Sequence, residues 1–133
     1  SIRSLVHRFY EEIWNEQRLD LVPDVLAPAV KFRGSLGSTR VGHHEFCEYV
    51  REVTGALEHY RCTIESLVVE NNTAAARLTF TGIHVARFLD RSPTGRQVSW
   101  AGAAFFHATD TTIDDIWVLG DLVNLLAQLD DPR

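Results

Sequence analysis

The sequence changes from a helical to an extended pattern at residues 60–84, which read YRCTIESLVVENNTAAARLTFTGIH. From Tyr60 onward the apolar residues repeat with a period of two, which is typical of β-strands. The Asn71-Asn72 pair in the middle of the stretch is a signal for a tight turn. We therefore expect an antiparallel hairpin with strands over 60–70 and 73–84.

A second hairpin is expected after a longer connection over residues 85–96. Its strands span 97–108 and 113–121, on either side of the turn Thr109-Asp110-Thr111-Thr112. An apolar stretch at 122–129 predicts a helix directly after the last strand.

The first half of the chain is mainly helical. Apolar residues at i, i+3 and i+4 predict amphipathic helices over roughly 2–15 and roughly 43–58. Between them we expect a short helix that Asp20 caps and Pro28 ends, and a short strand at 30–33. Helices at the front and strands at the back indicate one α+β domain over residues 1–133. A strongly curved sheet can wrap around the N-terminal helices and leave a cone-shaped pocket for a small molecule.

Composition argues against several classes of function. The net charge of -5 and the lack of a basic run disfavour binding to nucleic acid or to an anionic membrane surface. No stretch approaches the roughly 18 apolar residues of a membrane span. The two cysteines, Cys47 and Cys62, suggest no disulfide framework, so the cytoplasm is the expected location. His43 and Cys47 have helical spacing, but no further ligands follow at zinc-site spacing, and we expect no metal.

Several short phrases of the sequence match one known family in their order and spacing. The phrases are Arg8–Glu16 (RFYEEIWNE), Leu19-Asp20-Leu21, Leu26-Ala27-Pro28, Phe80-Thr81-Gly82-Ile83-His84, Phe88-Leu89, Pro93-Thr94-Gly95-Arg96 and Trp117-x-x-x-Asp121-Leu122. With these phrases the sequence resembles the SnoaL-like polyketide cyclases of the NTF2-like superfamily. The resemblance covers essentially the whole chain.

The resemblance implies both a fold and an activity. The fold would be the NTF2-like cone, a strongly curved antiparallel sheet wrapped around N-terminal helices. The best-known family members close the last ring of aromatic polyketide methyl esters by an intramolecular aldol reaction, with no metal and no organic cofactor. Their acid/base carboxylate falls at Asp121 of this sequence, and His84 matches a histidine that is common in the family.

Asp121 is also a candidate from the residues themselves. Strand alternation puts Asp115, Trp117, Leu119 and Asp121 on one face, which is apolar between its terminal acids. An apolar wall would favour the protonated carboxyl and suit it to proton transfer. Aspartate is equally a favoured N-cap residue, and Asp121 stands directly before the apolar helix. Both interpretations stay open, and they are compatible.

Two histidines are further candidates for a catalytic role. His84 lies at a predicted strand end, where it could hydrogen-bond a substrate carbonyl, assist proton transfer or simply bond to the backbone. His107 would face the pocket if the hairpin register carries it inward, whereas a slip of one residue or a bulge would turn it outward.

Aromatic side chains are candidates for the wall of a substrate site, because flat ligands stack well on rings, although each could equally belong to the core. Arg33 would favour an anionic or carbonyl-rich ligand or form an ion pair, and many relatives have histidine or asparagine there. The connection over 88–95 would lie over the mouth of the cone, and relatives tend to carry Gly and Pro where this chain has Asp90, Arg91 and Ser92. The aromatic candidates are Tyr10, Trp14, Tyr49, Phe88, Trp100 and Trp117.

Two hypotheses of function follow from these residues. The first is a cofactor-free enzyme that acts on a hydrophobic, cyclic carbonyl compound, with Asp121 as acid/base and His84 and His107 assisting. The second is a non-catalytic ligand-binding or dimerisation module, in which Asp121 only caps a helix. We expect a homodimer that packs through the outer face of the sheet, where small and polar side chains permit contact between subunits. The expected outer-face positions are Thr63, Glu65, Arg77, Thr79, Ala101 and Ala103.

Overall fold

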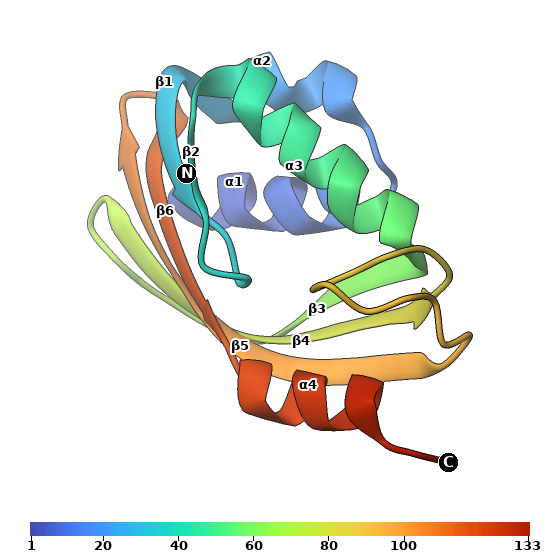
Figure 1. Ribbon diagram of the computed structural model, residues 1–133. Coiled ribbons are helices and arrows are strands. Elements are labelled where there is room, and N and C mark those ends of the chain that lie inside the picture. Colours follow the sequence, from blue (N-terminus) through green and yellow to red (C-terminus); the bar gives the residue numbers. More distant parts are fainter.

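The computed structural model describes residues 1–133. Its helices are α1 (Ile2–Arg8), which continues into the π-helix η1 (Phe9–Trp14), the 3₁₀-helix η2 (Leu19–Leu21), α2 (Val22–Val25), α3 (Gly42–Ala56) and α4 (Leu122–Asp130). Figure 1 shows α1 and α3 on the concave side of the sheet, while α4 lies against the opposite side.

Six strands form one curved sheet. They are β1 (Leu26–Arg33), β2 (Thr39–Val41), β3 (Leu57–Glu70), β4 (Thr73–His84), β5 (Gln97–Thr109) and β6 (Thr112–Gly120). Their order across the sheet is β2-β1-β6-β5-β4-β3. All neighbouring pairs are antiparallel except β1 and β6, which run parallel. The sheet curves around α1 and α3 (Figure 1), so the predicted α+β cone is confirmed.

The first strand begins earlier than the sequence predicts. Leu26, Ala27 and Pro28 belong to β1 and not to a helix that ends at Pro28. Proline has no N–H to donate to a neighbouring strand. Pro28 is tolerated because the pairing of β1 with β6 is interrupted between Leu26 and Lys31, where no such hydrogen bond is needed. β2 has only three residues, too few for a period of two to show in the sequence.

Aromatic rings hold the helices inside the sheet. The ring centroid of Phe9 lies 5.5 Å from that of Phe46 on α3 and 5.9 Å from that of Phe106 on β5. Phe32 on β1 completes the cluster, 5.0 Å from Phe46. All four are buried, and their tilted and edge-on contacts add to the gain from burying apolar area. Part of the cone is therefore filled by a solid aromatic core.

A single extra residue interrupts the pairing of β6 with β5. Ala108 pairs with Ile113 and His107 pairs with Asp115, so Asp114 has no partner on β5. This β-bulge reverses the alternation that begins at Ile113.

The bulge decides which side chains of β6 enter the cone. Ile116 and Val118 are buried, whereas Trp117 and Leu119 are 42% and 52% exposed on the convex face. If the strand kept regular alternation through Asp114, with no bulge, the buried Ile113 would be followed by Trp117 and Leu119 on the same inward face.

Asn15 joins the end of η1 to β3. Its Nδ2 donates to the carbonyl oxygen of Cys62 at 2.9 Å, and its Oδ1 accepts from the N–H of Cys62 at 2.8 Å. Its own backbone N–H donates to the carbonyl oxygen of Tyr10, five residues back, as a π-helical turn requires. These bonds fix the turn that carries Tyr10 and Trp14 against the inner face of the sheet.

α4 protects the part of β5 that β6 does not reach. The side-chain amide of Gln128 accepts from the N–H of Ser99 at 3.0 Å and donates to the carbonyl oxygen of Ser99 at 2.7 Å. The backbone N–H of Asp121 donates to the carbonyl oxygen of Ala101 at 2.8 Å. An open strand edge is thereby closed without another strand.

Replacing Asn15 with alanine leaves the backbone N–H and carbonyl of Cys62 unpaired in a buried place, and each loss costs about 1–3 kcal/mol. We expect Asn15→Ala to lower the free energy of unfolding by roughly 2–4 kcal/mol in urea denaturation. Glu16→Ala, at an exposed neighbour, is the matched control and should stay within about 0.5 kcal/mol of the unsubstituted chain. Equal effects of the two substitutions would contradict this role of Asn15.

Candidate functional site

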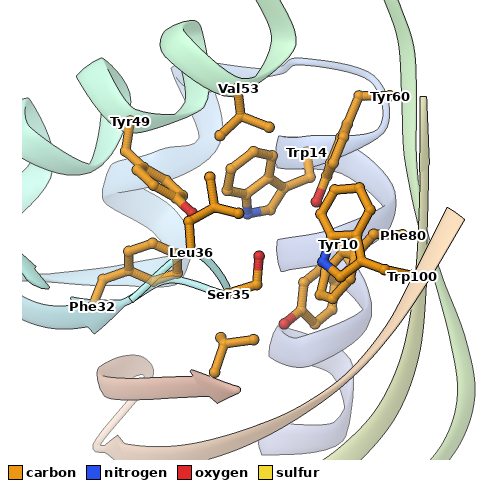
Figure 2. Close-up of a pocket in the computed structure, with 11 residues that line it drawn as sticks. Tyr10, Trp14, Phe32, Ser35, Leu36, Tyr49, Val53, Tyr60, Phe80 and Trp100 are labelled. Carbon is orange, nitrogen blue, oxygen red and sulfur yellow. The ribbon is translucent and has the colours of Figure 1, made fainter. Parts of the chain in front are cut away.

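A cavity lies between the helices and the inner face of the sheet (Figure 2). Its volume is about 10 Å³, roughly the room that one water molecule needs. A larger ligand therefore enters only if side chains move. The cavity is lined by Tyr10, Trp14, Phe32, Ser35, Leu36, Tyr49, Val53, Tyr60, Phe80, Trp100 and Val118.

Elements from both halves of the chain supply the walls of the cavity. The π-helix η1 presents Tyr10 and Trp14, and α3 presents Tyr49. Phe80 and Trp100 occupy paired positions on β4 and β5, and their rings stack with centroids 5.1 Å apart and planes at 30°. The wall is thus built mainly of flat aromatic surfaces, which suit a flat ligand.

The polar atoms of the cavity belong to neutral groups, and no charged side chain lines it. Figure 2 shows the hydroxyls of Ser35 and Tyr60 and the indole nitrogens of Trp14 and Trp100 directed toward the central space. Tyr10 Oη and Trp100 Nε1 are buried and have no hydrogen-bond partner in the protein. A buried donor without a partner costs about 1–3 kcal/mol. These two atoms are therefore the strongest indication of a place for a hydrogen-bond acceptor.

Burial keeps the phenols of the cavity protonated. It raises the pKa of Tyr10 and of Tyr60 well above the usual value of a phenol, and the neighbouring Cys62 adds to both shifts. Burial also raises the pKa of Tyr49. A phenol that stays protonated donates a hydrogen bond and is no general base. At neutral pH the wall therefore offers hydrogen-bond donors and no group ready to take a proton.

The loop over residues 34–38 closes one side of the cavity. A Cβ on Gly120, at the end of β6, would lie 2.9 Å from the carbonyl oxygen of Ser35. A Cβ on Gly34 would lie 2.5 Å from the hydroxyl oxygen of Tyr49. The absence of a side chain at both positions lets the loop approach the wall this closely.

A second hollow, of about 290 Å³, adjoins the cavity, and we call it the vestibule. Unlike the cavity it carries charges of both signs. It shares three side chains with the cavity, so the two hollows are adjacent. The vestibule is lined by Leu36, Tyr49, Glu52, Val53, Arg87, Phe88 and Leu89.

Five of the predicted aromatic wall residues face this ligand space. Tyr10, Trp14, Tyr49 and Trp100 line the cavity, and Phe88 lines the vestibule. Their contact with a substrate stays a prediction.

Asp121 caps α4 on the convex side of the sheet. Its Oδ1 accepts from the backbone N–H of Asn124 at 3.1 Å, and its side chain is exposed. The predicted N-cap is therefore confirmed. The prediction that Asp121 borders the apolar wall of the cone is wrong, because the bulge at Asp114 turns this face of β6 outward. A catalytic role of Asp121 stays a prediction.

His107 lies on the convex face, where it alternates with the buried Phe106 and Ala108. Its Nδ1 lies 2.7 Å from Oδ1 of Asp114, and the hydroxyl of Thr109 donates to the other carboxylate oxygen. Desolvation raises the pKa of Asp114, but the hydrogen bonds with Thr109 and His107 outweigh it and hold the pKa below its usual value. The alternative in which His107 faces the pocket is therefore wrong.

His84 is the one predicted histidine on the inner face, and it is fully buried at the end of β4. The backbone N–H of Thr94 donates to its Nδ1 at 3.1 Å, which confirms the predicted bond to the backbone. Nδ1 therefore holds a lone pair, and the proton of the neutral ring is on Nε2. Nε2 has no partner in the protein. His84 does not line the cavity, and its role toward a substrate stays a prediction.

Arg33 and Trp117 meet on the convex face and not in the cavity. They occupy paired positions on β1 and β6, and the guanidinium carbon of Arg33 lies 5.0 Å from the centre of the Trp117 ring. Nη1 of Arg33 donates to the carbonyl oxygen of Val118. Their prediction as wall residues of the cavity is therefore wrong. The bulge in β6 turns Trp117 outward, and alternation in β1 places the buried Phe32 inside and Arg33 outside.

Some residues that line the cavity were not named as candidates from the sequence, although strand alternation could have identified part of them. Tyr60 and Phe80 lie at inward positions of the first hairpin, and the period of two along 60–84 is sufficient to find them. Ser35 and Leu36 reach the cavity from a loop without a period, so no local signal marks them.

Residues 4–129 match a family model described as SnoaL-like polyketide cyclase. The chain belongs to the SnoaL-like polyketide cyclase family. Among solved structures it is similar to TsrD from Streptomyces laurentii, with 26% identity and a TM-score of 0.86 over 97% of this chain and 94% of that one. A SnoaL-like polyketide cyclase from Agrobacterium tumefaciens C58 has 24% identity and a TM-score of 0.77, over 91% of this chain and 92% of its own. A protein from Jannaschia sp. CCS1 named after the same family has 17% identity and a TM-score of 0.88, over 98% and 92% of the two chains.

No curated protein sequence matches this SnoaL-like chain. None of its helices is both long enough and apolar enough to cross a membrane. Its His, Cys, Asp and Glu side chains nowhere gather in a group of three or more that could hold a metal ion. Both cysteines, Cys47 and Cys62, are free thiols.

The position of Asp121 predicts the effect of two substitutions on stability. Asp121→Ala removes the cap and should lower the free energy of unfolding by about 1 kcal/mol. Asp121→Asn keeps an acceptor for the N–H of Asn124 and should change that free energy by no more than about 0.3 kcal/mol. Urea denaturation at neutral pH measures both. A loss as large for asparagine as for alanine would mean that charge, and not the cap hydrogen bond, holds α4.

Proposed function

We propose that the protein binds a neutral, flat, carbonyl-bearing compound in the cavity. There it would promote an intramolecular aldol ring closure or an isomerisation, without a metal or an organic cofactor. The supporting observation is the pair of buried donors without partners, Tyr10 Oη and Trp100 Nε1, which carbonyl oxygens would satisfy. A charged carboxylate ligand is disfavoured because no basic side chain lines the cavity.

Ring closure needs one carbon–carbon bond and the transfer of one proton. A proton leaves a carbon flanked by carbonyls, that carbon attacks a second carbonyl carbon, and the resulting alkoxide takes up a proton. The donors of the cavity would stabilise the negative oxygen of the enolate and of the alkoxide. The aromatic walls would hold the substrate in a folded shape in which the two carbons meet.

We assign the proton transfer to water, because the wall itself has no suitable base. The lining side chains are phenols, indoles, a serine and hydrocarbons, and none of these takes a proton readily at neutral pH. A carbon flanked by two carbonyls next to an aromatic system is already fairly acidic. Asp121 is the rival assignment that the family suggests. If Asp121 carries the proton, Asp121→Asn will lose turnover and still bind the ligand.

A second function, non-catalytic binding of the same ligand class, is favoured by one observation. The carboxylate that the family places in catalysis is engaged as a helix cap outside the cavity. A binding module would tolerate Asp121→Asn and would leave the ligand unchanged. An assay in which chromatography follows the conversion of an uncyclised polyketide ester distinguishes the two functions. An enzyme would form product, and a binding module would leave the ester unchanged.

Tyr10→Phe tests the ligand site. We expect it to weaken the binding of an anthraquinone methyl ester about threefold to tenfold, since one hydrogen bond contributes about 0.5–1.5 kcal/mol. Quenching of tryptophan fluorescence measures the affinity. The substitution should not destabilise the fold, because the lost hydroxyl has no partner.

The matched control for this substitution is Trp117→Phe, on the convex face, which should bind the ester as the unsubstituted chain does. Binding that is unchanged in Tyr10→Phe would contradict the cavity as the ligand site.

We also propose that two copies of the chain pair through the convex face of the sheet. Phe105, Trp117 and Leu119 form an apolar strip there, each between 42% and 53% exposed. Exposed apolar strips of this kind mark interfaces. Glu65 and Arg77 on the neighbouring strands add both signs of charge, so the surface would be complementary to a second copy related by a two-fold axis.

Leu119→Arg places a charge in this strip and should separate the two copies. Light scattering should then give the mass of one chain, 15.0 kDa, in place of twice that mass. Val41→Arg, at an exposed apolar position on the edge strand β2, is the control and should remain dimeric. An unsubstituted chain that is monomeric at micromolar concentrations would refute the interface.

A further inference from the structure

The loop after β4 holds Phe88 in a tight and strained turn. The N–H of Phe88 donates to the carbonyl oxygen of Arg91 at 3.0 Å, and the N–H of Arg91 donates back at 2.9 Å. The two residues between them, Leu89 and Asp90, both have a left-handed backbone, with φ of 49° and 64°. This conformation is unfavourable for Leu89, whereas aspartate adopts it more readily than most residues, so the strain lies mainly at Leu89. Strain of this kind persists where surrounding contacts impose it, and it is frequent at ligand clamps.

Ion pairs on the surface hold this turn. Nε and Nη2 of Arg91 each donate at 2.8 Å to the carboxylate of Asp130, at the end of α4. Nη2 of Arg87 donates to Oδ1 of Asp90 at 2.6 Å. Exposed ion pairs contribute little to stability compared with the burial of an aromatic ring. The main cost of moving the turn is therefore the exposure of the buried Phe88 ring, which is 7% exposed.

The ring of Phe88 stands against two side chains that each end in an unpaired N–H. Its centroid lies 6.2 Å from that of His84 and 6.5 Å from that of Trp100, and the side chain is 7% exposed. Nε2 of His84 and Nε1 of Trp100 are both buried without a partner in the protein. Trp100 belongs to the wall of the cavity, whereas Phe88 lines the vestibule. Phe88 thus lines the vestibule and packs beside the rings of His84 and Trp100, the two side chains that carry the unpaired donors.

The backbone holds His84 in one orientation. Its N–H donates to the carbonyl oxygen of Arg96, and its carbonyl oxygen accepts from the N–H of Gly95, both at 2.8 Å. The N–H of Thr94 occupies Nδ1, so the ring cannot turn to find a partner for Nε2 without losing this bond. Nε2–H of His84 is therefore a hydrogen-bond donor in a fixed position with no acceptor in the protein.

We propose that Phe88 is a displaceable plug over a second ligand subsite, in which Nε2–H of His84 donates a hydrogen bond to a carbonyl oxygen of the ligand. This inference rests on the proposed function, because it needs a ligand in the cavity. The cavity holds about one water molecule, so a side chain must leave when a larger ligand enters. Departure of Phe88 would join the vestibule to the cavity and uncover two donors at once.

Nitrogen NMR of the histidine rings tests the subsite in the unsubstituted chain, and His84→Phe assigns the signals. In the free protein Nε2 should be protonated and Nδ1 should not. Saturation with an anthraquinone methyl ester should move the Nε2–H proton of His84 downfield. Tryptophan fluorescence of the same sample reports whether the ester binds at all. Quenching without movement of this proton would overturn the subsite and leave the proposed function intact, whereas no quenching would overturn both.

Removal of the plug gives an independent measurement. Phe88→Ala should bind the ester about tenfold more tightly, because the ligand no longer has to expel a buried ring. Adding His84→Phe to Phe88→Ala should weaken binding again, about threefold to tenfold. Val123→Ala, which shortens an exposed apolar side chain on α4 outside the proposed dimer strip, is the control and should leave the affinity unchanged. Weaker binding by Phe88→Ala than by the unsubstituted chain would overturn the plug.

Discussion

Asp114 stands unpaired in β6, and this extra residue governs the chemical character of both faces of the sheet. Beyond the bulge, Ile116 enters the cone while Trp117 and Leu119 face outward. Asp121 follows directly after the strand, so its carboxylate also leaves the cone and caps α4. The cavity is uncharged as a result, and the convex face gains an apolar strip.

An uncharged cavity with buried donors limits what the protein can bind. In the free protein the unpaired Tyr10 and Trp100 donors are unfavourable, and a ligand with acceptor oxygens would relieve that cost. The gain is specific, because a hydrocarbon ligand of the same shape would leave both donors unpaired. The same donors cannot remove a proton from a substrate. Any reaction in the cavity therefore depends on the acidity of the substrate and on the conformation in which it is bound.

The mouth of the cone is controlled by parts of the chain that lie far apart in the sequence. The loop over 34–38 reaches the wall beside Gly120, and the loop over 85–96 brings Phe88 to the vestibule. α4 braces the second loop from outside the cone, since Nη1 of Arg96 donates to the carbonyl oxygen of Gln128 at 2.8 Å. A cation at the carboxyl end of a helix is also favourable for the helix dipole. α4 therefore bears on the ligand site although it contributes no side chain to the cavity.

Local patterns in the sequence were sufficient for the two long helices, the C-terminal helix, the two hairpins, the cap at Asp121 and the inward aromatics of the first helix. Each of these depends mainly on residues that are close in the sequence. Local patterns did not predict which side chains of β6 point into the cone. Alternation relates one residue to the next but gives no absolute direction, and the extra residue at Asp114 reverses it. That bulge is held across the hairpin by His107 and Thr109. Only the tertiary structure could therefore place Trp117 outside the cone, since contacts between strands, and not the period of one strand, decide which face is buried.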